Sequence, residues 1–109
     1  MTPKAGTAQA FAGTEKVVTI TVKGGGKIEV DKNTILLSKA RGDRASWRRE
    51  GEGPFKIIFR GVLPLGSLVF DQDHAKNLAP DANAPLDTYK YTVQVPGCDD
   101  LDPEVIVDQ

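Results

Sequence analysis

The residues that could hold a soft metal ion or act as nucleophiles are few in this sequence. The chain of 109 residues contains one cysteine, Cys98, one histidine, His74, and one methionine, Met1. Zinc and copper sites take at least three protein ligands, mostly thiolates and imidazoles, so this set cannot complete a site within one chain. We therefore predict no metal site, no cofactor and no catalytic residue. Cys98 is interpreted as a turn thiol, with a redox-sensitive thiol or a metal site shared between chains as the alternatives.

Oxygen ligands are more plentiful, at Asp99, Asp100, Asp102 and Glu104. Carboxylates at alternating spacing can bind Ca²⁺, but this segment lacks the glycine and the loop length of an EF-hand. We interpret it as a solvated acidic edge, because charged side chains on a strand edge discourage pairing with other chains.

Arginine is concentrated in the segment RGDRASWRRE, at Arg41, Arg44, Arg48 and Arg49. We call these four residues the arginine segment and consider them, with His74, as the candidate partner surface. The alternative is that they are ordinary solvent-facing arginines, since isolated surface charges contribute little to stability. The Arg-Gly-Asp tripeptide within the segment is interpreted as a turn, because glycine and aspartate favour turns through their backbone chemistry.

The overall charge is nearly balanced, with 14 basic against 15 acidic residues and a net charge of −1. A general nucleic-acid binder needs a surplus of positive charge, so we predict no nucleic-acid partner. The charges are unevenly distributed, since residues 1–70 hold twelve of the basic and six of the acidic side chains. We expect the partner to be another protein or a second copy of the chain.

Targeting and membrane signals are not visible in the sequence. The opening residues MTPKAGTAQAFAGTEK contain no apolar run of the length that a signal peptide needs. No segment approaches the roughly 20 apolar residues of a membrane span. We expect a cytoplasmic protein without a membrane partner, or a periplasmic or secreted one if a signal peptide has been removed.

Apolar and polar residues alternate along much of the chain, as half-buried strands require. The alternation is clear in residues 16–23, 27–31, 55–59 and 89–95. The glycines at 24–26 predict a hairpin or a corner between sheets, and Gly42 with Asp43 predicts a turn. In the strand that follows, Ala45 and Trp47 are expected on one face, and Arg44, Ser46 and Arg48 on the other.

The length fits a single domain. We predict a flexible N-terminal arm over residues 1–14 and one β-sandwich domain over residues 15–109, with a long insert at 61–86. The insert contains three prolines and no sustained alternation, with one helical turn expected in FDQDHAKNL. A connection of this length should contain local structure or serve a function.

About seven short strands and almost no helix predict an all-β fold, an antiparallel β-sandwich. Trp47 is expected between the sheets with six other residues. They are Ile20, Ile28, Phe55, Ile57, Tyr91 and Val93.

The order of these pieces resembles the cupredoxin family, the Greek-key β-sandwich of blue copper proteins. The matching stretches are KIEVDKNTILLSKARGDRASW, FKIIF, the long connection after it, and YKYTVQV. The resemblance covers roughly residues 17–107 and implies a copper site of two histidines and a cysteine, usually with a distant methionine. No histidine follows the tryptophan strand here, and neither histidine nor methionine follows Cys98.

We therefore expect a copper-free cupredoxin-like domain that acts as a non-catalytic binding or assembly module. Two alternatives from other classes remain. One is an electron-transfer copper protein with altered ligands, and the other is a small hydrolase whose side chains meet only in the fold.

Overall fold

The computed structural model describes residues 14–51, 53–60 and 64–109. These residues form eight strands and no helix. The strands are β2 (Glu15–Lys23), β3 (Lys27–Val30), β4 (Thr34–Ser38), β5 (Arg44–Arg49), β6 (Lys56–Phe59), β7 (Val69–Asp71), β8 (Asp87–Gln94) and β9 (Glu104–Asp108). The predicted arm falls outside the described residues except for Thr14.

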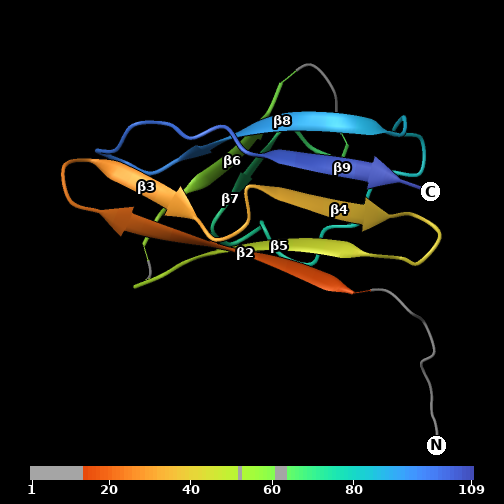
Figure 1. The fold of residues 1–109 in the computed structure, drawn as a ribbon, viewed down its shortest axis with the longest axis horizontal. Coiled ribbons are helices and arrows are strands. Elements are labelled where there is room, and N and C mark those ends of the chain that lie inside the picture. Colours follow the sequence, from red (N-terminus) through yellow and green to blue (C-terminus); the bar gives the residue numbers. More distant parts are fainter. Residues whose placement is uncertain (1–13, 52, 61–63) are drawn as a thin grey trace, which may run out of the picture.

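The strands build two sheets that pack face to face, with β8 and β9 above β2 and β5 in Figure 1. One sheet has the order β3-β2-β5 and the other the order β4-β9-β8-β6-β7. The predicted all-β sandwich is therefore present, but the prediction that it is antiparallel is wrong. β2 pairs with β5 in parallel, and β4 pairs with β9 in parallel. The remaining pairs are antiparallel, so both sheets are mixed.

The three-glycine segment forms the hairpin turn between β2 and β3, one of the two arrangements expected for it. Lys23 lies opposite Lys27 across this turn. Gly25 and Gly26 have φ angles of 77° and 74°, which side chains with a Cβ rarely adopt.

The turn between β4 and β5 is a corner that carries the chain from one sheet to the other. Asp43 is fully buried at this corner. Its carboxylate accepts hydrogen bonds from the backbone N–H of Thr14 at 3.0 Å and of Ser38 at 2.9 Å, and from the guanidinium of Arg41 at 3.2 Å. Burial opposes ionisation of the carboxyl, but the two backbone donors and Arg41 outweigh it and lower its pKa to about 2. The aspartate of the Arg-Gly-Asp tripeptide is thus buried, and its carboxylate accepts hydrogen bonds from the backbone.

The core lies between the sheets and is centred on Trp47, which is 1% exposed. Its indole N–H donates to the hydroxyl of Tyr91 at 3.0 Å, and the two rings meet edge to face with centroids 5.3 Å apart. Burial raises the pKa of Tyr91 to about 12, so the hydroxyl stays protonated. The other residues expected around Trp47 are all buried, namely Ile20, Ile28, Phe55, Ile57 and Val93.

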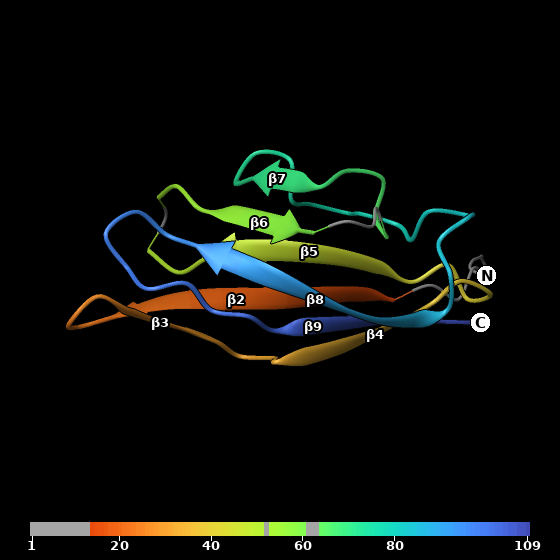
Figure 2. The same cartoon turned by 90° about the horizontal axis from the view of Figure 1, so that it is seen from above.

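The insert at 61–86 binds the edges of both sheets. β7 extends the larger sheet beside β6, and the next residues form one turn in which His74 and Ala75 donate to the carbonyl of Asp71. The chain then runs along the free edge of β5, where Ala45 and Leu78 exchange backbone hydrogen bonds of 2.8 Å. The insert therefore passes from β7, outside β6, to the edge of β5 (Figure 2).

Candidate functional site

The four arginines do not form one continuous strip. Arg44 and Arg48 are exposed on the outer face of β5. Arg41 lies in the corner turn, where it binds Asp43. Arg49 falls on the same side of β5 as Trp47, is half-buried, and donates through Nη1 to the carbonyl of Pro54 at 3.0 Å.

His74 is exposed in the turn of the insert. Its ring Nδ1 lies 2.6 Å from Oδ1 of Asp71. The hydrogen bond from His74 is the main reason that the pKa of Asp71 is lowered. The imidazole is therefore held by its neighbour in the turn.

The insert and β5 nevertheless form one surface, because the insert binds β5 through both backbone and side chains. Trp47 donates its backbone N–H to the carbonyl of Ala75, and Asn77 donates to the hydroxyl of Ser46, both at 2.8 Å. Arg44 reaches the carbonyl of Asn77 at 3.3 Å. Ser46, expected on the face opposite Trp47, is buried, and its hydroxyl forms hydrogen bonds with both Asn77 of the insert and Glu15 of β2. We call residues 44–49 and 72–78 the β5–insert surface.

A concave site of 310 Å³ lies at the end of this surface. Its lining includes three cations, Arg48, Arg49 and Lys76, and one acid, Asp73. Among the described residues, none of these three cations forms an ion pair within 4 Å. The site therefore has excess positive charge.

The guanidinium of Arg49 packs closely against the loop after β5. A Cβ at Gly53 would lie 2.5 Å from Nη1 and 2.9 Å from Cζ of Arg49, so a larger residue at this position would require the guanidinium to move. Among the described residues, the buried Nε of Arg49 has no hydrogen-bond acceptor. Buried polar groups in folded proteins nearly always have a partner, so this donor is a candidate to bind a ligand.

A second concave site, of 250 Å³, adjoins the first, because Phe55 and Gln72 line both. It is lined by Pro54, Val95 and Pro96, and also by two charged residues, Lys56 and Asp100. We call the two sites together the edge groove. It has a cationic end at Arg48, Arg49 and Lys76 and an apolar end at Pro54 and Pro96.

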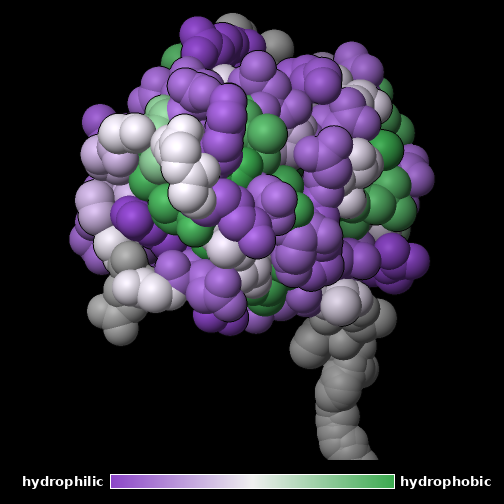
Figure 3. Space-filling view, turned by 60° about the vertical axis from the view of Figure 1, so that its left-hand side comes forward, coloured by the Kyte–Doolittle hydropathy of each residue, from purple (hydrophilic) through white to green (hydrophobic). Residues whose placement is uncertain are grey.

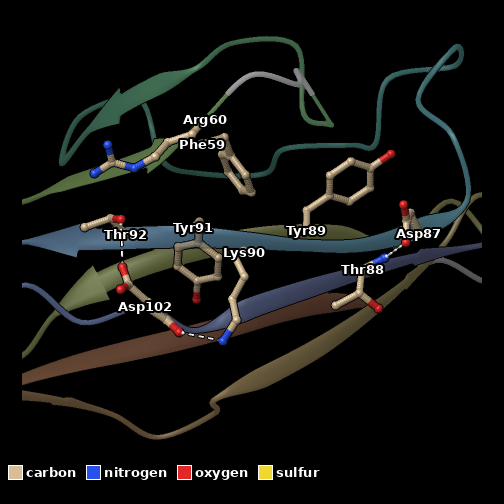
Figure 4. Close-up of a pocket in the computed structure, with 9 residues that line it drawn as sticks. All are labelled: Phe59, Arg60, Asp87, Thr88, Tyr89, Lys90, Tyr91, Thr92 and Asp102. Carbon is tan, nitrogen blue, oxygen red and sulfur yellow. Dashed lines mark hydrogen bonds between the residues drawn. The ribbon is translucent and has the colours of Figure 1, made fainter.

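A third concave site, of 540 Å³, lies along β8 and the end of β6 (Figure 4). Its polar groups bind one another. Thr92 donates to Asp102 at 2.8 Å, and Lys90 donates to the carbonyl of Asp102 at 3.4 Å. The hydroxyl of Tyr89 donates to the carbonyl of Pro85.

Cys98 is partly buried in the turn after β8, where it packs against the core and donates its N–H to Val95 at 3.0 Å. The nearby acids are dispersed. Asp99 pairs with Lys27 at 2.9 Å, and Glu104 accepts from Thr34 at 3.2 Å. Over residues 14–51, 53–60 and 64–109, no three histidine, cysteine, aspartate or glutamate side chains are grouped so that they could hold a metal ion.

Comparison of the sequence with protein-family models and with curated proteins finds no match. In the part of the chain that the structure describes, no helix has the length and apolar character to cross a membrane.

Proposed function

We propose that this chain is a non-catalytic, copper-free cupredoxin-like module that binds another protein, or a second copy of itself, through the β5–insert surface. The observation that carries the proposal is the attachment of the insert to β5. The sequence named two separate candidates, the arginine segment and the insert around His74. The hydrogen bonds at Ala45, Ser46 and Trp47 bring them together.

The chemistry of this surface favours recognition of an acidic partner. Arg44 and Arg48 project from the same face of β5, and Lys76 lies beside them in the insert. Complementary charge across an interface mainly sets the association rate and the choice of partner. A rigid strand edge with exposed guanidinium groups suits that role, because its backbone is already ordered before binding.

The cupredoxin-like part of the proposal rests on the ordered resemblance in sequence and on the two packed sheets. The ligand set of a blue copper site is missing from the sequence, which has one histidine and one cysteine. In the structure His74 lies in the turn after β7 and pairs with Asp71, while Cys98 lies in the turn after β8.

Titration with Cu²⁺ tests the metal part. We expect no intense thiolate-to-copper absorption in the visible region and no stoichiometric copper after dialysis. A blue one-to-one complex with a copper EPR signal would show that the module is an electron-transfer protein with altered ligands. The Cys98→Ser variant is the control, because any thiolate band must disappear with the thiol.

Charge reversal on β5 tests the partner surface. Replacing Arg44 and Arg48 by glutamate is expected to weaken partner capture or self-association at least about tenfold at low salt, with less effect at high salt, where charges are screened beyond about 8 Å. The melting temperature should change little, because exposed charges contribute roughly 0 to 1 kcal/mol. Sedimentation and capture from native lysate provide the measurements.

A matched double variant controls for net charge. Lys27→Glu with Lys90→Glu makes the same change in charge on β3 and β8, and both lysines are exposed. We expect this variant to keep the partners and the association state of the natural chain. Equal behaviour of the two double variants and the natural chain at every salt concentration would contradict the assignment of the β5–insert surface.

A further inference from the structure

We propose that the edge groove binds an apolar carboxylate, with the carboxylate at Arg48, Arg49 and Lys76 and the apolar group against Pro54 and Pro96. This assignment rests on the proposed function, because it gives the ligand chemistry of one end of the β5–insert surface. In a protein partner the matching group is a free C-terminus after an apolar residue.

The anionic half of the ligand is argued from the cationic end. Three cations face one acid, so the site keeps a positive charge that a single carboxylate reduces but does not reverse. Arginine presents several N–H donors in a planar fork that matches the two oxygens of a carboxylate. Arg49 donates through Nη1 to the carbonyl of Pro54, and its buried Nε has no acceptor among the described residues.

The apolar half is argued from the adjoining site. Phe55 and Gln72 belong to both sites, so a ligand bound at the arginines extends along them toward Pro54 and Pro96. Both proline rings are exposed, while Val95 is buried beneath them. The two sites enclose 310 and 250 Å³, which together fall in the usual range of about 300 to 1,000 Å³ for ligand pockets.

The direction of binding is set by the difference in charge between the two ends. Lys56 and Asp100 both line the apolar end, so their charges balance there. The cationic end has three cations and one acid among its described lining residues, which favours placement of the ligand carboxylate at the arginines. In the space-filling view of Figure 3, hydrophilic side chains cover most of the face and hydrophobic atoms appear in separate patches. The apolar group of the ligand needs one of these hydrophobic patches, and a charged group beside the patch sets the orientation of the ligand.

Small probes test the groove without any partner. The probes are 3-phenylpropionate, its neutral amide, acetate and inorganic phosphate, followed by backbone amide shifts and by the fluorescence of Trp47, which lines the cationic end. We expect saturable binding of 3-phenylpropionate and about tenfold or greater weakening for each other probe. Equal binding of the amide would remove the arginines from the assignment, and equal binding of acetate or phosphate would remove the apolar end.

Variants locate the site. Arg48→Gln and Lys76→Gln should each weaken 3-phenylpropionate binding about tenfold, whereas Lys90→Gln, a matched change at the concave site along β8, should not weaken it. Gly53→Ala leaves the charge unchanged but forces the Arg49 guanidinium to move, and it should also weaken binding. Amide shifts distant from the loop report whether each variant keeps the native fold. Unchanged affinity in the two glutamine variants would overturn the proposal.

A peptide pair separates the two sources of the ligand. If the natural ligand is a protein C-terminus, acetyl-Gly-Gly-Phe with a free carboxylate should bind more tightly than 3-phenylpropionate, and its C-terminal amide should not bind. If it is a free organic acid, the peptide should bind no better than 3-phenylpropionate. Saturable binding of 3-phenylpropionate to the natural chain, together with partner capture that Arg44→Glu with Arg48→Glu leaves unchanged, would contradict the proposed function alone. Loss of partner capture without any probe binding would contradict the groove assignment alone.

Discussion

Replacing Trp47 by alanine is expected to lower the free energy of unfolding by about 3 to 5 kcal/mol, because truncation of a large buried aromatic residue loses transfer energy and leaves a cavity. Trp47 is 1% exposed. The change also removes an edge-to-face contact with Tyr91 and the donor to its hydroxyl. This loss is a large part of the roughly 5 to 15 kcal/mol that stabilise a domain.

Urea denaturation measures the loss in the free energy of unfolding, provided that the dependence of this free energy on urea concentration is unchanged. Two further variants serve as controls. Trp47→Phe keeps an aromatic ring but removes the hydrogen bond, so we expect a loss of about 1 to 3 kcal/mol. Leu36→Ala changes a side chain that is 38% exposed and should cost about 1 kcal/mol or less. A cost for Trp47→Ala no larger than that of Leu36→Ala, or native fluorescence like that of indole in water, would contradict the buried position.

Replacing Asp43 by asparagine is expected to cost about 2 to 4 kcal/mol at neutral pH. The carboxylate accepts hydrogen bonds from Thr14, Ser38 and Arg41 in a fully buried position. A hydrogen bond to a charged group contributes roughly 1.5 to 3 kcal/mol, and a buried donor left without a partner costs about 1 to 3 kcal/mol. The amide of asparagine has one acceptor oxygen, so at least one backbone N–H loses its partner.

The same residue predicts a pH dependence. Its pKa is lowered from 3.8 to about 2 in the folded chain, so the folded state binds fewer protons than the unfolded state between these values. The stabilisation, about 2 kcal/mol, is complete above about pH 4 and is lost as the pH falls toward 2. The stability difference between the natural chain and Asp43→Asn should therefore shrink over that interval.

A matched aspartate provides the control for this corner. Asp31 is exposed and accepts the backbone N–H of Thr19 at 2.8 Å. Its replacement by asparagine should cost about 1 kcal/mol or less, because water can take its place at the exposed donor. If Asp31→Asn and Asp43→Asn cost the same, or if the cost at Asp43 does not vary below pH 4, then the buried carboxylate is not what holds the corner.

Local alternation predicted the strands well, because burial on one face leaves a period of two in the sequence. It placed Ile20, Trp47 and Tyr91 in the core. The three glycines predicted a hairpin or a corner between sheets, and the structure has the hairpin. Alternation did not predict which strands pair. The parallel pairs of β2 with β5 and of β4 with β9 depend on contacts between distant segments, which leave no local pattern. The Greek-key and cupredoxin-like assignments remain proposals.

The candidate site was predicted less completely. Alternation along β5 puts Arg49 on the same face as Trp47. The same pattern, continued to the end of the strand, predicts that Arg48 and Arg49 lie on opposite faces. Turn chemistry identified the Gly-Asp turn, but nothing local indicates that Asp43 is buried or that it accepts a hydrogen bond from Thr14, which lies 29 residues away. Lys76 and Gln72 meet β5 only because the insert pairs with its edge. That pairing uses backbone groups, which every residue has, so the sequence gives no signal for it.

The position of β9 has a consequence for how the chain acquires its structure. β9 lies between β4 and β8 in the larger sheet, and Thr34 meets Glu104 across 70 positions of sequence. Until β9 is synthesised and inserted, β4 and β8 each present an unpaired edge. Contacts of such long range slow folding, to milliseconds or seconds in comparable β proteins. During that interval the open edges can pair with other chains. Nascent or C-terminally shortened forms should therefore depend on chaperones far more than the completed domain.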